Sequence, residues 1–555
     1  MSQLADEVSG NICDERSEID FVCAEAEEKS SKIPLEMCHA SVKFVERISI
    51  SYARRHGVMG VLLRDGDAVD VRDQDKMILA VGEHCDEDVV DVLRRLLGVT
   101  NVRVMAFDHA DVLAKINQAY QQQTGQADAV IDRLEVNKDN DLGQLLNTTS
   151  GGREDLLDIG SRAPVIKLVN LILFEAVKAE ASDVHIQPYE DRLVVRLRID
   201  GVLFDAYTLP RGVLEEMVSR VKVMGKMNIA EKRLPQDGRA TVQVGDRVVD
   251  LRISSVPSSH GERIVIRLLD KGARLHTLSE LGMRGQTYEE YRSLIGVEHG
   301  LILVTGPTGS GKSTTLYASL SEINSKRSNI LTLEDPIEYQ LDGISQIQVS
   351  EKKGMTFASG LRSVLRQDPD IVMVGEIRDH ETAVLAIQAA LTGHLVFSTL
   401  HTNDAASAIT RLLDLGIEPY LVASSLVGVM AQRLVRRVCT ECGQFDDTAV
   451  APLHRLNLDE KLVDVGRMRV GSGCETCRET GYRGRVGLYE LLTVNEPIRE
   501  LVQTRSTAAQ IKQAAIQSLG MRPLRESGIE KVLSGVTTVD EILRVTMREI
   551  SGGNV

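Results

Sequence analysis

The chain has 555 residues, a formal net charge of −15 and no tryptophan. Its length exceeds what one hydrophobic core supports, so we expect about three or four domains. The acidic balance and the shortage of aromatic side chains argue against a large nucleic-acid interface and against base stacking. No stretch approaches roughly 18 uninterrupted apolar residues, and residues 1–20 lack an apolar core. We therefore expect no membrane-spanning helix and no signal peptide, and a cytoplasmic protein that meets a membrane only through partners.

The amino-terminal part is predicted to contain an extension, a small domain and a linker. Residues 1–42 are acidic and are expected to be flexible, with an acidic docking arm as the alternative. Residues 43–122 have a globular pattern, with one helix over 42–53, a strand at 60–63 and a second helical face near 89–93. Residues 123–155 are polar and are interpreted as a linker.

Residues 156–275 are predicted to form a mixed α/β domain. A helix is expected to begin at Pro164, because proline suits the first helical turn. Alternating apolar residues predict strands on both sides of a turn at Asp200-Gly201, and further strands at 240–244, 248–253 and 263–269. Residues 278–290 are interpreted as a partly helical connector.

The strongest motif is a glycine-rich phosphate loop of the pattern G-x-x-x-x-G-K-[ST]. It follows a short apolar run and precedes a helix-forming stretch, and it consists of Gly306, Pro307, Thr308, Gly309, Ser310, Gly311, Lys312, Ser313 and Thr314. In such a loop backbone N–H groups bind phosphates, Lys312 bridges the β- and γ-phosphates and Ser313 binds Mg²⁺. The sequence therefore predicts binding of ATP or GTP with Mg²⁺.

From residue 300 onward, short apolar strands alternate with amphipathic helices. The strands are expected at 301–304, 330–333, 371–374 and 395–399, which indicates a parallel sheet with helices on both faces. Residues 498–550 are expected to be helical and to carry no catalytic chemistry.

Acidic residues follow two of these strands. Glu334 and Glu338 lie in Glu-Asp-Pro-Ile-Glu after the second strand, and Glu376 follows the third. Carboxylates beside a nucleotide orient Mg²⁺ or the attacking water, while a solvated acidic turn is the alternative for Glu334 and Glu338. Glu334 and Glu376 compete for the role of water-polarising base, and the spacing does not decide between them.

Two histidines flank the fourth strand. A neutral imidazole at a strand end can hydrogen-bond a γ-phosphate, so His394 and His401 are candidates for that contact. A lone histidine is often a structural residue, which is the alternative for His394.

Four cysteines form two C-x-x-C pairs, Cys439 with Cys442 and Cys474 with Cys477. Four thiolates can close a tetrahedral Zn²⁺ site that stabilises an insertion over residues 437–480. Two disulfides and an iron–sulfur centre are the alternatives, and disulfides are disfavoured in the cytosol.

The order of these motifs resembles the secretion ATPases of the type II and type IV pilus superfamily, and most nearly the GspE family. The resemblance is carried by the phosphate loop, Glu-Asp-Pro-Ile-Glu, Val-Gly-Glu-Ile-Arg-Asp, Gly-His…Thr-Leu-His-Thr-Asn and the tetracysteine. Three upstream segments, 181–188, 233–239 and 257–263, also match, so the resemblance extends from about residue 156 to the carboxyl terminus.

The resemblance implies an α/β multidomain protein. It implies a RecA-like P-loop core over 276–555 with a helical part at 495–555, a PAS-like domain over 156–275 and a docking domain over 43–122. It also implies a homo-hexamer in which arginines neutralise γ-phosphate charge. Arg252 and Arg267 are the candidates, Arg239 is less certain, and Arg362 and Arg366 form a second pair whose alternative is an exposed helix face.

The function implied is ATP hydrolysis that drives a type II secretion system, assembling a pseudopilus and exporting folded proteins. The implied partners are inner-membrane platform proteins: the cytoplasmic domain of a GspL-type recruiter and a GspF-type polytopic protein. A type IV pilus extension ATPase is the nearest alternative. A nucleic-acid-translocating P-loop motor and a regulatory scaffold with little hydrolysis are the others.

Overall fold

The computed structural model describes Leu35 and Cys38, and then residues 39–62 except 49, 77–82, 87–99, 102–124, 154–155, 164–270 except 245–246, 275–445 except 325–326 and 351–352, and 467–546. The chain divides into two compact units, Met1–Gln123 and Thr124–Val555. Most of the predicted acidic extension and most of the predicted linker lie outside the described residues. No helix within the described part combines the length and the apolar character needed to cross a bilayer.

The first unit is a small α/β fold. Its sheet has the order β1 (His39–Ala40), β2 (Val58–Leu62), β3 (Met77–Val81) and β4 (Arg103–Ala106). The sheet is accompanied by α1 (Val42–Arg47), α2 (Ile50–His56), α3 (Glu87–Leu97) and α4 (His109–Thr124). The single helix expected over 42–53 is wrong, because Ile48 has an extended backbone (φ −105°, ψ 132°) that ends α1. The strand expected at 60–63 is confirmed as β2.

The second unit begins with a seven-stranded sheet. Its order is β5 (Glu154–Asp155), β9 (Gln236–Val244), β10 (Arg247–Ser258), β11 (Gly261–Asp270), β6 (Asp183–Pro188), β7 (Arg192–Ile199) and β8 (Val202–Pro210). The sheet packs with α7 (Pro164–Lys178) and α8 (Leu214–Met224). The predicted helix start at Pro164 is confirmed, and the predicted Asp200-Gly201 turn joins β7 to β8 with both residues at positive φ.

A second seven-stranded sheet carries the phosphate loop. Its order is β14 (Ser345–Gln348), β13 (Ile330–Glu334), β15 (Ile371–Val374), β16 (Leu395–Leu400), β12 (Gly300–Thr305), β17 (Leu426–Val438) and β20 (Tyr482–Thr493). Neighbouring strands are parallel except β17 and β20, which are antiparallel. The four predicted strands are confirmed, but β14, β17 and β20 were not predicted.

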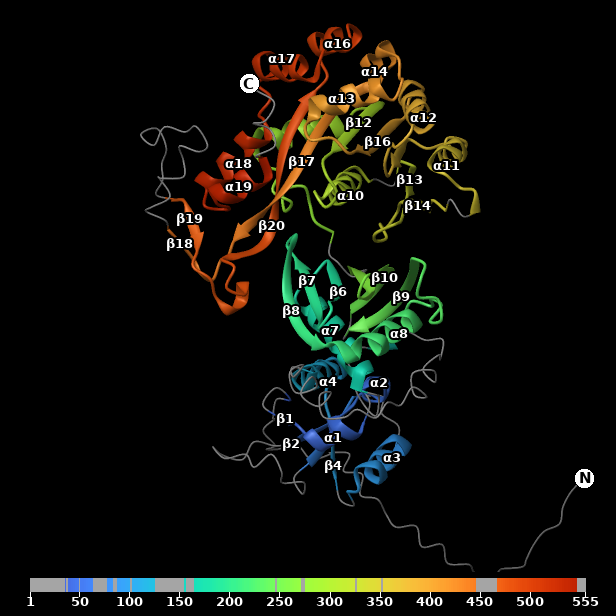
Figure 1. The fold of residues 1–555 in the computed structure, drawn as a ribbon, viewed down its shortest axis with the longest axis vertical. Coiled ribbons are helices and arrows are strands. Elements are labelled where there is room, and N and C mark those ends of the chain that lie inside the picture. Colours follow the sequence, from blue (N-terminus) through green and yellow to red (C-terminus); the bar gives the residue numbers. More distant parts are fainter. Residues whose placement is uncertain are drawn as a thin grey trace, which may run out of the picture. The chain divides into compact units, whose positions relative to one another are not determined.

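Helices cover both faces of this sheet (Figure 1). Alternate residues of β12 enter different cores, because successive strand side chains point to opposite faces. Leu301 and Leu303 pack in the core that includes α11 (Phe357–Val364), α12 (His380–Leu391) and α13 (Ala405–Asp414). Ile302 and Val304 pack in the core that includes α9 (Gly285–Ile295) and α10 (Lys312–Ile323).

The carboxyl-terminal region is helical, as predicted. It contains α16 (Glu496–Gln503), α17 (Ala508–Leu519), α18 (Leu524–Leu533) and α19 (Val539–Thr546), which pack on the same face as α14 (Pro419–Ser425). A two-stranded sheet of β18 (Gly443–Phe445) and β19 (Arg469–Gly471) precedes β20 and lies beside the cysteines.

Candidate active site

The phosphate loop connects β12 to α10. Gly306, Gly309 and Gly311 all have positive φ, which glycine adopts without a steric cost. A Cβ at Gly306 would lie 2.4 Å from the carbonyl oxygen of Gln432, so the loop approaches β17 too closely for a side chain there. The loop thus reaches the first turn of α10 with its backbone free to face a phosphate.

Lys312 folds over this loop. Its Nζ donates hydrogen bonds to the carbonyl oxygens of Gly306 (2.9 Å) and Pro307 (3.2 Å). Burial lowers the pKa of Lys312 to about 8, although the nearby Glu376 carboxylate opposes this shift. The ammonium group is therefore desolvated and close to the position that a triphosphate occupies in such loops.

The polar atoms of the loop fit a phosphate ligand. Ser310 Oγ is buried and has no hydrogen-bond partner among the described residues. A buried hydroxyl without a partner is costly, and a phosphate oxygen would satisfy it. Ser313 is exposed at the start of α10, where its hydroxyl can reach a cation.

The phosphate loop, the two acidic segments and His401 lie at or just after the carboxyl ends of parallel strands, and so they meet at one edge of the sheet. A hydroxyl pair joins two of these ends, because Thr305 Oγ1 and Thr402 Oγ1 lie 2.7 Å apart. Thr305 Oγ1 also accepts from the backbone N–H of Thr402 at 2.9 Å. The loop that carries His401 is therefore tied directly to the phosphate-loop strand.

Glu376 lies between Arg378 and His401. It forms an ion pair with Arg378, and its Oε2 lies 3.0 Å from His401 Nε2. Burial raises the pKa of Glu376, but the hydrogen bonds from His401 and Arg378 outweigh it and hold the pKa below its ordinary value. Glu376 is thus an ionised carboxylate on the side of the site that faces Lys312.

Glu334 is more deeply buried, with 4 % of its surface exposed. It accepts hydrogen bonds from the hydroxyls of Tyr317 and Thr332, and its Oε1 accepts from Gln346 Nε2 at 3.0 Å. Glu338 lies farther along the same loop, and burial raises its pKa. Tyr317 and Gln346 are site residues that the sequence analysis missed, because no local pattern indicates their contacts with Glu334.

The candidate arginines lie in one row across the first sheet of the second unit. Cross-strand register pairs Arg239 with Arg252, and Arg252 with Arg267. Arg252 Nη2 lies 3.7 Å from Glu338 Oε2, and Arg267 Nε lies 3.1 Å from Asp183 Oδ1. The row therefore brings at least one guanidinium from the first sheet to the acidic loop of the second.

Three predicted site residues lie elsewhere. His394 precedes β16, and its Nδ1 lies 2.9 Å from the carbonyl oxygen of Ala389, at the opposite end of that strand from His401. The proposed contact of His394 with the γ-phosphate is therefore wrong, because a strand of this length separates its ends by about 20 Å. Arg362 forms an exposed ion pair with Glu381, and Arg366 donates a hydrogen bond to Ser363 on its own helical turn, which favours the exposed-face alternative.

The four cysteines of the C-x-x-C pairs form one cluster. Their sulfurs lie within 4.8 Å of one another, and individual S–S separations are 3.6, 3.7 and 3.9 Å. A tetrahedral zinc with Zn–S bonds of about 2.3 Å holds its sulfurs about 3.8 Å apart. The cluster fits a tetrahedral metal site, and all four cysteines are free thiols, which excludes disulfides between them.

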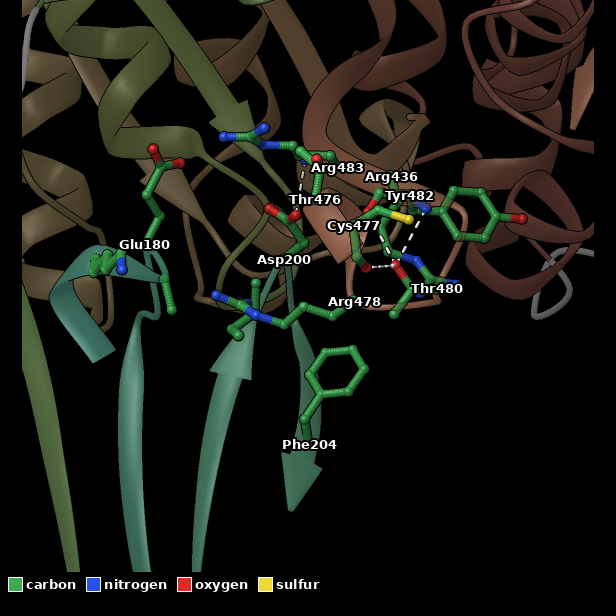
Figure 2. A pocket seen from close by; sticks show the side chains of 14 residues that line it. Glu180, Asp200, Phe204, Arg436, Thr476, Cys477, Arg478, Thr480, Tyr482 and Arg483 are labelled. Carbon is green, nitrogen blue, oxygen red and sulfur yellow. Dashed lines mark hydrogen bonds between the residues drawn. The ribbon is translucent and has the colours of Figure 1, made fainter. Parts of the chain in front are cut away.

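A polar pocket lies beside this cluster, away from the phosphate loop. Asp200 of the β7–β8 turn and Phe204 of β8 line it together with Cys477, Arg478 and Arg483, and Figure 2 shows Phe204 next to Arg478. The Asp200 carboxylate accepts from the backbone N–H of residue 484 at 2.8 Å and pairs with Arg485 at 3.3 Å. This contact joins the β7–β8 turn to the start of β20.

The fold and the site together define a P-loop nucleoside triphosphatase: a glycine loop with its lysine, and two strand-end acids on one edge of a mainly parallel sheet. A family model described as Type II/IV secretion system protein matches residues 158–544. The chain therefore belongs to the Type II/IV secretion system protein family, in its type II secretion system protein E branch, and it is an ATPase.

Individual relatives are similar over most of their length. The chain is 48 % identical to Type II secretion system ATPase E of Vibrio cholerae over 444 residues, which cover 80 % of this chain and 87 % of the relative. It is 53 % identical to Type II secretion system protein E of Aeromonas hydrophila over 396 residues, covering 71 % and 78 %. The ATPase DotB of Legionella pneumophila shares the fold, with a TM-score of 0.51, 21 % identity and coverage of 72 % of this chain and 100 % of DotB.

Proposed function

We propose that this chain is the ATP-hydrolysing motor of a type II secretion system. In this proposal it powers pseudopilus assembly and the export of folded proteins, works as a homo-hexamer at the cytoplasmic face of the inner membrane, and meets the membrane through a GspL-type recruiter and a GspF-type polytopic protein. The observation that carries the proposal is the meeting of the phosphate loop, Glu334, Glu376 and His401 at one sheet edge, in a chain about half identical to type II secretion ATPases.

In this proposal residues 276–555 form a RecA-like core, and the preceding residues 156–275 form a PAS-like domain. The RecA-like assignment is supported by β16 lying between the phosphate-loop strand β12 and the acidic strand β15. ATP binds along the loop from Gly306 to Thr314, with Mg²⁺ held by the Ser313 hydroxyl. Zn²⁺ bound by the four cysteines holds residues 437–480 together without taking part in hydrolysis.

The two acids take different roles in this proposal. The Glu376 carboxylate is already stabilised by hydrogen bonds from Arg378 and His401, which makes it a weak proton acceptor, so Glu376 is assigned to the Mg²⁺ side of the site. Glu334 is assigned as the base that polarises the attacking water, because its carboxylate is desolvated and contacts only neutral donors. His401 orients Glu376 through its 3.0 Å contact.

The arginine row supplies positive charge during hydrolysis. Arg252 already lies within 3.7 Å of Glu338, and Arg267 also interacts electrostatically with that carboxylate. We propose that Arg252 and Arg267 neutralise charge that develops on the γ-phosphate, with Arg239 as the next member of the row. Movement of the first sheet relative to the second then accompanies bond cleavage.

A secretion assay tests the proposed function. The gene is deleted in the native bacterium, and secreted folded enzymes are measured after complementation with the wild-type chain or with Lys312→Ala. We expect the wild type alone to restore secretion, while surface pili are unaffected by the deletion. Loss of pili with normal secretion would favour the pilus extension alternative, and DNA-stimulated ATP turnover by the purified protein would favour the nucleic-acid motor.

A further inference from the structure

Tyr317 connects the phosphate-loop helix to the acidic loop. It lies on α10, one helical turn after Ser313, and its side chain is fully buried (0 % exposed). Its hydroxyl donates to Glu334 Oε2 and accepts from the backbone N–H of Glu338 at 3.2 Å. Its ring packs edge-on against Tyr339, with centroids 4.5 Å apart.

We propose that Tyr317 is a positioning residue for ATP hydrolysis, whose hydroxyl fixes the Glu334 carboxylate and the acidic loop relative to the phosphate-loop helix. This inference rests on the proposed function, in which Glu334 polarises the attacking water. Thr332 and Gln346 hold the other oxygen of the carboxylate, so the Tyr317 hydroxyl completes a set of donors that allows one orientation only. Because Tyr317 lies on α10, which begins at Lys312, the position of the phosphate-loop helix determines the orientation of the Glu334 carboxylate.

The hydroxyl, rather than the ring, carries this role. A phenylalanine would fill the same space in the apolar core, but it would leave both Glu334 Oε2 and the Glu338 N–H without their partner. Burial and the adjacent Glu334 carboxylate raise the pKa of Tyr317 above its ordinary value. The phenol therefore stays protonated and remains a hydrogen-bond donor over the whole range in which an enzyme is assayed.

Tyr317→Phe tests the inference, and the chain supplies a matched control. Tyr291 on α9 is equally buried in the same core, and its hydroxyl shares a hydrogen bond with Ser319 (2.9 Å) away from the acidic loop. The full-length variants are compared for kcat, KM for ATP and the pH dependence of kcat. Thermal melting reports whether each variant is folded.

We expect Tyr317→Phe to lower kcat about ten- to a hundredfold, with KM changed less than about twofold, because a hydrogen bond to the catalytic carboxylate is lost. The acid limb of the kcat profile should move to higher pH, since the lost donor stabilised the ionised carboxylate. Tyr291→Phe should keep the wild-type profile. If Tyr317→Phe does not fold, 3-fluorotyrosine at position 317 keeps the ring, is a stronger donor and should move the acid limb to lower pH.

Glu334→Gln separates failure of the inference from failure of the proposed function. Wild-type turnover by Glu334→Gln would overturn the assignment of Glu334 as base, regardless of the result for Tyr317→Phe. If Glu334→Gln is inactive while Tyr317→Phe retains the wild-type kcat and acid limb, Tyr317 is a packing residue and the positioning role is overturned. An unmoved acid limb in the fluorotyrosine protein would overturn it in the same way.

Discussion

The low pKa of Lys312 predicts that nucleotide binding weakens above pH 8. Burial lowers this pKa to about 8, so the side chain loses its charge as the pH rises through that value. A triphosphate favours the protonated form, and binding must then restore the proton. At pH 9 only about one lysine in ten is protonated, so ATP should bind about tenfold more weakly than at pH 7, a cost of about 1.4 kcal/mol.

Isothermal titration of a non-hydrolysable ATP analogue with Mg²⁺ measures this coupling. Titrations at pH 7 and pH 9 give the change in affinity. Repeating the pH 9 titration in buffers of different ionisation enthalpy gives the number of protons taken up, which should approach one per site. At pH 7 the uptake should be about tenfold smaller, because most lysines are already charged.

Lys312→Arg is the matched control, since arginine stays protonated throughout this range. The variant is expected to bind more weakly at pH 7 but to lose the change in affinity between pH 7 and pH 9. Equal affinity of the wild-type protein at both pH values, with no proton uptake at pH 9, would refute the reasoning that burial of Lys312 controls its charge.

Three further predictions concern other parts of the chain. Arg252→Ala should lower kcat at least about tenfold in a steady-state phosphate-release assay, while substitution of the exposed Arg362 by Ala should change kcat less than about twofold. Similar effects of the two substitutions would contradict the role assigned to the arginine row. Cys439→Ser should reduce the zinc content, measured by atomic emission, from about one ion per chain and should lower the melting temperature. The control Cys38→Ser should leave the metal in place. An unchanged zinc content in Cys439→Ser would exclude the site. Burial opposes ionisation of Glu541, but its two arginine partners, Arg436 and Arg544, lower its pKa to about 2. Glu541→Gln should therefore lower the free energy of unfolding in urea by up to about 3 kcal/mol at pH 7, and the difference from the wild type should close as the pH falls from about 4.5 towards 2. Equal stability of the two proteins at pH 7 would speak against this ion cluster.

Local patterns were sufficient for the strands and motifs of the nucleotide site. β12, β13, β15 and β16 are short, largely apolar runs bounded by glycine or polar residues, and such runs are typical of buried parallel strands. The phosphate loop was predictable because its glycines and Lys312 are adjacent in sequence. The acids were predictable because each follows the end of a buried strand.

Contacts between distant segments were not predictable in the same way. Arg433 and Arg436 are close in sequence and show no pattern that indicates their partners, but they lie on β17, where they contact Asn403 and Glu541. Tyr317 has the apolar neighbours of any core tyrosine, and only the fold brings its hydroxyl to Glu334. His394 and His401 were grouped because they are close in sequence, although an extended strand separates them.

Single-turnover hydrolysis by Glu334→Gln and Glu376→Gln distinguishes the roles proposed for the two acids. Each full-length variant is mixed with ATP and Mg²⁺, and bound nucleotide and released phosphate are followed separately. We expect Glu334→Gln to bind Mg-ATP with nearly wild-type affinity but to release phosphate at least about a hundredfold more slowly, and Glu376→Gln to need more Mg²⁺ for binding. Wild-type phosphate release by Glu334→Gln would contradict the role proposed for Glu334.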